Sequence, residues 1–111
     1  MRILEFNVEK QQLTKKSDCD FSGLVAGSMG YLKAKFYFSK EWDRCATKVA
    51  SFWERNEEHA AILDADNTCL IPHEALVSGK FYVSAIGASD TYRLATNRTK
   101  VVQEVTRYGN R

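Results

Sequence analysis

Along most of the chain, apolar and polar residues alternate with a period of two, which is the pattern of a β-strand with one buried face. In residues 31–38 (YLKAKFYF) every second residue from Leu32 to Phe38 is apolar, and lysines and tyrosines lie between them. In residues 47–55 (TKVASFWER) the same alternation places Trp53 on the face opposite Phe52. The pattern therefore predicts strands with one face in a core and one face toward solvent.

Short runs of this kind recur about every ten residues and are separated by turn residues, which is typical of an antiparallel sandwich or barrel. The predicted strands cover residues 2–9, 31–38, 47–55, 59–64, 68–71, 80–87, 91–96 and 100–105. An extension of the first strand toward Leu13 is one expectation. The fold class expected is all-β, an antiparallel immunoglobulin-like β-sandwich of about seven to eight short strands.

Turn residues separate the predicted strands. The sequence DADN at 64–67 predicts a hairpin over 59–71, and NRT at 97–99 is interpreted as a turn, although its letters match a glycosylation site. Helical turns are expected at 72–76, where Pro72 suits a first helical position, and within 39–48.

Residues 17–30 combine three glycines with serines and aspartates, so they predict a long connection. One β-sandwich domain is expected over residues 1–111, because a chain of this length can build one hydrophobic core.

Composition narrows the functional classes. Apolar residues make up 44% and aromatic residues 12%, as in a folded domain, and a net charge of +2 does not predict nucleic-acid or membrane binding. The basic residues Arg93, Arg98 and Lys100 are interpreted as solvated strand edges. Three cysteines without a CxxC pair favour reduced thiols over disulfides or zinc. Neither a signal peptide nor an apolar run long enough to span a membrane is present in the sequence.

Two clusters of residues are candidates for a catalytic site or a metal site. Cys69, His73 and Glu74 lie close in sequence, so a small hydrolase using Cys69 and His73 is one hypothesis, which requires the two side chains to face each other in a cleft. Asp64 and Asp66 resemble the start of a calcium loop, but Cys69 stands where that loop needs glycine. The sequence therefore predicts a connector and a turn at these places, with no catalytic residue, metal or cofactor.

Exposed aromatic side chains on a β-scaffold bind proteins or sugars. We interpret Trp42 and Trp53 as core or sheet-packing residues, which leaves the outer tyrosines and one histidine as a candidate interaction surface. This predicted surface consists of Tyr31, Tyr37, His73, Tyr82 and Tyr92.

Four segments taken in order carry a resemblance to a known family. They are YLKAKFYFSKEWD (31–43), TKVASFW (47–53), AAILDADNTCLIPHEAL (60–76) and GKFYVSAIGASDTYRLATNRTKVVQEV (79–105). Together they resemble the N-terminal domain of phage baseplate upper proteins and related phage or prophage tail proteins, over about residues 30–106. His73 departs from the family pattern, which usually has tryptophan there, and puts local packing or a contact surface in doubt.

The resemblance implies a structural module, not an enzyme, which attaches receptor-binding machinery to a phage or prophage tail. The expected partners are other tail or baseplate proteins and further copies of the same chain in the assembly, with no nucleic acid and no membrane. The expected location is the virion tail, after synthesis in the cytoplasm of a bacterial host. The alternative is a carbohydrate-binding module that contacts host cell-wall sugars through its aromatic residues.

Overall fold

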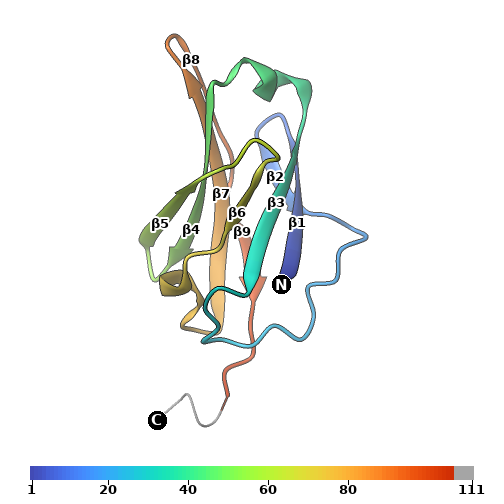
Figure 1. The fold of residues 1–111 in the computed structure, drawn as a ribbon, viewed down its shortest axis with the longest axis vertical. Coiled ribbons are helices and arrows are strands. Elements are labelled where there is room, and N and C mark those ends of the chain that lie inside the picture. Colours follow the sequence, from blue (N-terminus) through green and yellow to red (C-terminus); the bar gives the residue numbers. More distant parts are fainter. Residues whose placement is uncertain (107–111) are drawn as a thin grey trace.

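The fold is a sandwich of two β-sheets, shown in Figure 1. The computed structural model describes residues 1–106, so residues 107–111 of the predicted domain lie outside the described range. The strands are β1 (Arg2–Glu9), β2 (Gln12–Lys15), β3 (Leu32–Phe38), β4 (Thr47–Glu54), β5 (Glu57–Ile62), β6 (Thr68–Leu70), β7 (Lys80–Ser89), β8 (Tyr92–Ala95) and β9 (Thr99–Val102). Two short 3-10 helices, η1 (Lys40–Arg44) and η2 (His73–Leu76), join strands. No helix within residues 1–106 has the length and apolar character needed to cross a membrane.

One sheet has four strands in the order β2-β1-β3-β6. A tight turn joins β1 to β2, and Lys10 adopts a positive φ of 57° in it. The long connection after β2 returns the chain to the start of β3, so β1 and β3 run parallel, with Phe6 opposite Phe36. The predicted all-β sandwich is confirmed, and this parallel pair is the one departure from an antiparallel arrangement among the described strands.

The other sheet has five strands and is built around β7. The β4 strand pairs with one side of β7 and carries β5 at the edge. The opposite side of β7 is shared, because β9 pairs with Lys80–Val83 and β8 pairs with Ile86–Ser89. The long β7 strand is therefore the central strand of this sheet, with β4 on one side and β8 and β9 on the other.

The core fills the space between the sheets, as strand alternation requires. Phe36 from the four-stranded sheet and Phe52 from the five-stranded sheet are 1% and 0% exposed. Trp42 on η1 closes one end of the core, and its indole Nε1 donates to the Lys10 carbonyl at 2.7 Å. The predicted inward face of β3, with Leu32, Ala34 and Phe36 buried, is confirmed.

The turn at 64–67 is confirmed, but the hairpin predicted around it is wrong. The Asn67 amide donates to the Asp64 carbonyl at 2.8 Å, and Asn67 has a φ of 63°. However, β5 before the turn pairs with β4, and β6 after it pairs with β3. The turn thus carries the chain from one sheet to the other. The first strand is likewise not extended to Leu13, because residues 12–15 form the separate strand β2.

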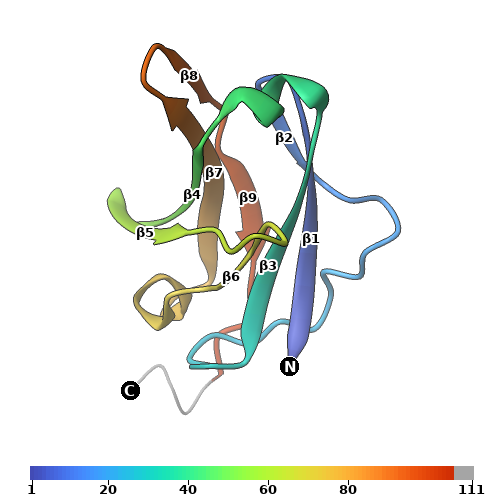
Figure 2. The ribbon, with the colours of Figure 1, turned by 45° about the horizontal axis from the view of Figure 1, so that its top comes forward.

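Both predicted helical turns are present, as η1 and η2. Residues 17–30 contain no strand apart from an isolated bridge between Val25 and Glu104. In Figure 2 this connection leaves β2, runs outside β1 and returns to β3. Its Gly27 amide donates to the Leu76 carbonyl at 2.7 Å, so the connection covers the end of the sandwich where β1 begins and β9 ends.

Candidate functional site

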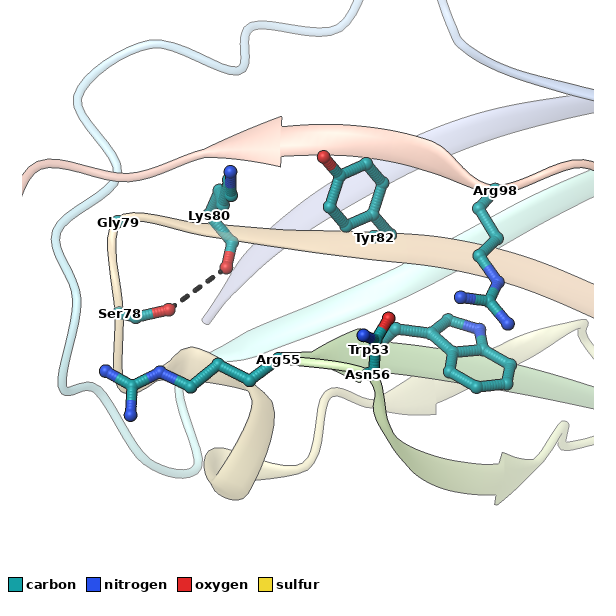
Figure 3. Close-up of a pocket in the computed structure, with 8 residues that line it drawn as sticks. All are labelled: Trp53, Arg55, Asn56, Ser78, Gly79, Lys80, Tyr82 and Arg98. Carbon is teal, nitrogen blue, oxygen red and sulfur yellow. Dashed lines mark hydrogen bonds between the residues drawn. The ribbon is translucent and has the colours of Figure 1, made fainter.

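A groove of about 750 Å³ lies on the outer face of the five-stranded sheet. It lies over the part of β4 and β7 nearest η2, beside the β4–β5 turn and the β8–β9 loop (Figure 3). Its lining consists of Trp53, Arg55, Asn56, Ser78, Gly79, Lys80, Tyr82 and Arg98. We call this feature the basic–aromatic groove. Its volume falls in the range of about 300–1,000 Å³ usual for ligand sites.

The aromatic part of the groove follows from sheet register. Trp53 on β4 lies directly opposite Tyr82 on β7, and both point outward because their neighbours Phe52 and Val83 are in the core. The indole Nε1 of Trp53 donates to the Ser84 hydroxyl at 2.9 Å. This bond holds the ring in one orientation on the sheet surface and leaves it partly exposed.

Arg98 covers one face of that ring. The central carbon of its guanidinium group lies 3.5 Å from the centre of the Trp53 ring, which is a close cation–π contact. Figure 3 shows the guanidinium group beside the indole. A stacked guanidinium group uses its flat face for the ring and keeps the N–H groups at its edge for acceptors.

The loop that carries Arg98 is anchored on both sides. Asn97 accepts a hydrogen bond from the Leu13 amide at 2.7 Å and donates to the Leu13 carbonyl at 3.2 Å. The Thr96 hydroxyl accepts from the Ala85 amide at 2.9 Å, and the Thr99 hydroxyl donates to the Leu13 carbonyl. Residues 96–99 are therefore more than a turn, because Asn97 and Thr99 bind β2 of one sheet, Thr96 binds β7 of the other, and the backbone of Arg98 is fixed between them.

The opposite border of the groove is the turn between β4 and β5, and its backbone is also held in one conformation. Arg55 and Asn56 have φ angles of 52° and 65°, which is the geometry of a two-residue hairpin turn. The Arg55 Nε atom lies 3.1 Å from the carboxylate of the buried Glu54. At the far end, the buried Gln103 donates from Nε2 to the Ser78 carbonyl at 2.9 Å and holds the loop before β7.

The groove is positively charged. Its lining includes the cations Arg55, Lys80 and Arg98 and contains no aspartate or glutamate. Among the described residues, Arg55 pairs with Glu54, but neither Lys80 nor Arg98 has an ion-pair partner. On the same face, Glu58 lies in register opposite Trp53, and its carboxylate accepts a hydrogen bond from the Ser51 hydroxyl. The arrangement suits a negatively charged occupant.

The structure distributes the five predicted interaction residues over several surfaces, and only Tyr82 lines the groove. Tyr37 lies on the outer face of the other sheet, where its hydroxyl donates to the Glu5 carboxylate at 2.8 Å. Tyr31 lies just before β3 and is 51% exposed. Tyr92 lies near η1, with its hydroxyl donating to the Glu41 carbonyl at 3.0 Å.

His73 begins η2, and its side chain is 42% exposed. Its Nε2 atom lies 3.6 Å from the Glu74 carboxylate, which is also exposed. His73 therefore belongs to the surface of the connector and not to the core.

The thiol of Cys69 faces the core and is 4% exposed. Burial raises the pKa of this thiol to about 12, so it stays protonated at neutral pH and is a poor nucleophile. The hydrolase hypothesis, which needs Cys69 in a cleft with His73, therefore gains no support. Within residues 1–106, no group of three or more His, Cys, Asp or Glu side chains is placed to hold a metal ion.

The sequence pattern missed the importance of Trp53 and Arg98. Trp42 is buried, as interpreted, but Trp53 is only half-buried and Arg98 is bound to it. One signal was present, because the alternation in 47–55 already put Trp53 on the face opposite Phe52. The proximity of Arg98, 45 positions later in the chain, depends on the pairing of β9 with β7 and is not visible in local sequence.

The fold and the groove together define a class, an all-β two-sheet sandwich that presents a basic, aromatic surface on one sheet. Among solved structures, the N-terminal domain of phage TP901-1 ORF48 has this fold, with a TM-score of 0.50. The match covers 96% of this chain and 100% of that one, at 9% sequence identity, so it concerns the fold. No protein-family model and no curated protein matches the sequence.

Proposed function

We propose that this chain is a structural module of a phage or prophage tail that attaches other tail proteins, including the receptor-binding apparatus. The observation that carries the proposal is the fold likeness to the N-terminal domain of a phage protein, which extends over the whole length of that domain. The resemblance of the four ordered segments between residues 31 and 105 to phage tail proteins supports the proposal independently, because it rests on the sequence and not on the fold.

The geometry of the chain is compatible with this role. Two sheets packed through a closed aromatic core make a rigid body, and the groove provides a surface on which a neighbouring protein can dock. A carbohydrate-binding role is less favoured, because sugars stack on the free faces of aromatic rings and Arg98 covers one face of Trp53.

The proposal is tested by mass spectrometry of phage particles purified from the strain that carries the gene. The expected result is that peptides of this chain are found in intact particles and are enriched when tails are separated from heads. A matched control is a cytoplasmic host protein of similar size, which should be lost on purification. If the chain is produced in the lysate but is absent from the particles, it is not a tail module.

A further inference from the structure

Building on the tail-module function proposed above, we propose that the basic–aromatic groove holds an extended acidic peptide segment of a partner protein. Arg98 is the principal carboxylate contact, with Lys80 and Arg55 as flanking cations. This assigns a docking surface and a partner chemistry to one face of the sandwich, the outer face of the five-stranded sheet.

Charge complementarity is the first argument. Lys80 and Arg98 line one hollow without an ion-pair partner among the described residues, while the chain as a whole carries a net charge of only +2. Lys100 extends the positive surface, because it lies in register beside Tyr82 on the same face. A local concentration of unpaired cations in a concave surface favours a negatively charged occupant.

Preorganisation is the second argument. The Arg98 backbone is held by Asn97 and Thr99, and its guanidinium group is held flat against Trp53. The ring is itself fixed by its hydrogen bond to Ser84. Because the side chain is already ordered, binding a carboxylate costs little of the entropy that a free arginine would lose. The exposed N–H edge of a guanidinium group matches the two oxygens of a carboxylate.

The shape and the polar groups favour a peptide over the other anionic polymers. Single-stranded nucleic acids stack their bases on open aromatic faces, but Arg98 occupies one face of Trp53. The side chain of Asn56 borders the groove and offers an amide donor and acceptor of the kind that peptide groups need.

The binding experiment uses a fluorescein-labelled peptide in which Glu alternates with Gly over about ten residues, so that carboxylates recur on one side of an extended chain. Fluorescence anisotropy at low ionic strength measures its affinity for the full-length protein. The same peptide with Gln in place of Glu is the neutral control. We expect the Glu peptide to bind, and the Gln peptide to bind at least tenfold more weakly.

The key variant is Arg98→Gln, and its matched control is Arg93→Gln. Both remove one positive charge from the same sheet, but Arg93 lies on β8, outside the groove lining. We expect Arg98→Gln to weaken binding by about tenfold or more, as for loss of a hydrogen bond between charged groups. Arg93→Gln should change it by less than about twofold. Arg98→Lys keeps the charge without the planar fork and should lie between them, and circular dichroism verifies that each variant is folded.

Three outcomes would overturn the assignment. One is equal weakening by the two Gln variants, which would indicate diffuse electrostatic attraction. Another is tighter binding of a labelled single-stranded DNA or a sulfated polysaccharide of equal charge, with the same dependence on Arg98, which would name a different occupant. The third is dimerisation through this face in sedimentation velocity, abolished by Arg98→Gln, which would make a second copy the occupant.

The inference and the proposed function fail in different ways. If Arg98→Gln protein enters phage tails as well as the wild type while losing the acidic peptide, the chain is a tail module but the groove is not its docking site. If the peptide binds in an Arg98-dependent way but the chain is absent from phage particles, the groove is correctly assigned and its partner is not a tail protein.

Discussion

The central guanidinium carbon of Arg98 lies 3.5 Å from the centre of the Trp53 ring, although the two residues are far apart in the sequence. The contact joins a β-strand to the loop between β8 and β9. It converts an arginine on an exposed loop into a fixed, positively charged group beside a partly exposed indole. Fluorescence can report on this pair, because Trp42, the other tryptophan, is fully buried.

Tryptophan quenching tests the charge around Trp53. We expect iodide, an anion, to quench the native fluorescence more strongly than caesium, a cation, because Arg98 and Lys80 raise the local concentration of anions. Trp53→Phe should remove most of the iodide quenching, and Arg98→Gln should reduce it. Neutral acrylamide controls for simple exposure. Iodide quenching that survives in Trp53→Phe would contradict this picture, because Trp42 is 0% exposed.

Asn97 is expected to contribute to stability although it lies in a loop. Its side chain satisfies both the amide and the carbonyl of Leu13, a residue that is 0% exposed. Asn97→Ala should lower the free energy of unfolding by about 1–3 kcal/mol, the usual cost of leaving a buried polar group without a partner. Urea denaturation measures the difference. The control is Asn7→Ala on the exposed face of β1, which should change stability by less than about 0.5 kcal/mol. Equal effects of the two variants would mean that Asn97 does not anchor the loop.

Gly87 is expected to tolerate no side chain. An added Cβ atom would lie 2.6 Å from the Cys45 Sγ atom and 2.8 Å from the Trp42 Cε3 atom, both in the packed core. Gly87→Ala should therefore destabilise the protein by about 1–3 kcal/mol, because overpacked cores must distort. Gly79→Ala is the matched control, since its Cβ would meet the nearest atom, Val105 Cγ2, at 3.4 Å. Thermal unfolding should show a lower Tm for Gly87→Ala alone, and an unchanged Tm there would show that η1 moves easily away from β7.

The three cysteines should differ in reactivity. Cys19 is partly exposed, whereas Cys45 and Cys69 are buried. Brief treatment of the native protein with iodoacetamide should modify one thiol, at Cys19, and treatment in urea should modify all three. Intact-mass spectrometry counts the adducts, and Cys19→Ser should abolish the fast one. Rapid native labelling of Cys69 would contradict the buried position of β6.

The Cys69 thiol also predicts a pH dependence of stability. Burial raises its pKa from an unfolded value of about 9 to about 12, so the folded state retains a proton that the unfolded state loses. The stabilisation is therefore fully present below about pH 9 and is lost as the pH rises toward about 12. Urea denaturation at a series of pH values should show a shallower alkaline decline for Cys69→Ala than for the wild type. Parallel declines would show that this thiol does not contribute.

Much of the fold was predictable because strand alternation is a local property. The pattern in 31–38 identified the inward face of β3, and Asp64 and Asn67 marked a turn. The predicted hairpin over 59–71 failed because a turn fixes the direction of the chain, not the partner of the strand that follows. Both β5 and β6 are short, and β5 pairs with β4 whereas β6 pairs with β3.

The candidate interaction surface was likewise predictable only in its local features. Alternation put Trp53 on the face opposite Phe52, and Tyr82 was expected on an outer surface, but no local pattern linked the two residues to each other. Tyr37 and Tyr82, which look equivalent in sequence, lie on outer faces of different sheets. A surface is defined by strand order and register, and both depend on contacts between residues far apart in the chain.

The amino-acid sequence by itself therefore determined that this protein is an all-β sandwich, where most of its strands lie and where the chain turns. Each of these properties follows from the spacing of neighbouring side chains and from the backbone preferences of single residues. Only the tertiary structure decided that β1 and β3 run parallel, that β5 and β6 separate into different sheets and that Arg98 stacks on Trp53. These features arise from the shared burial of segments distant in sequence, which spacing along the chain does not encode.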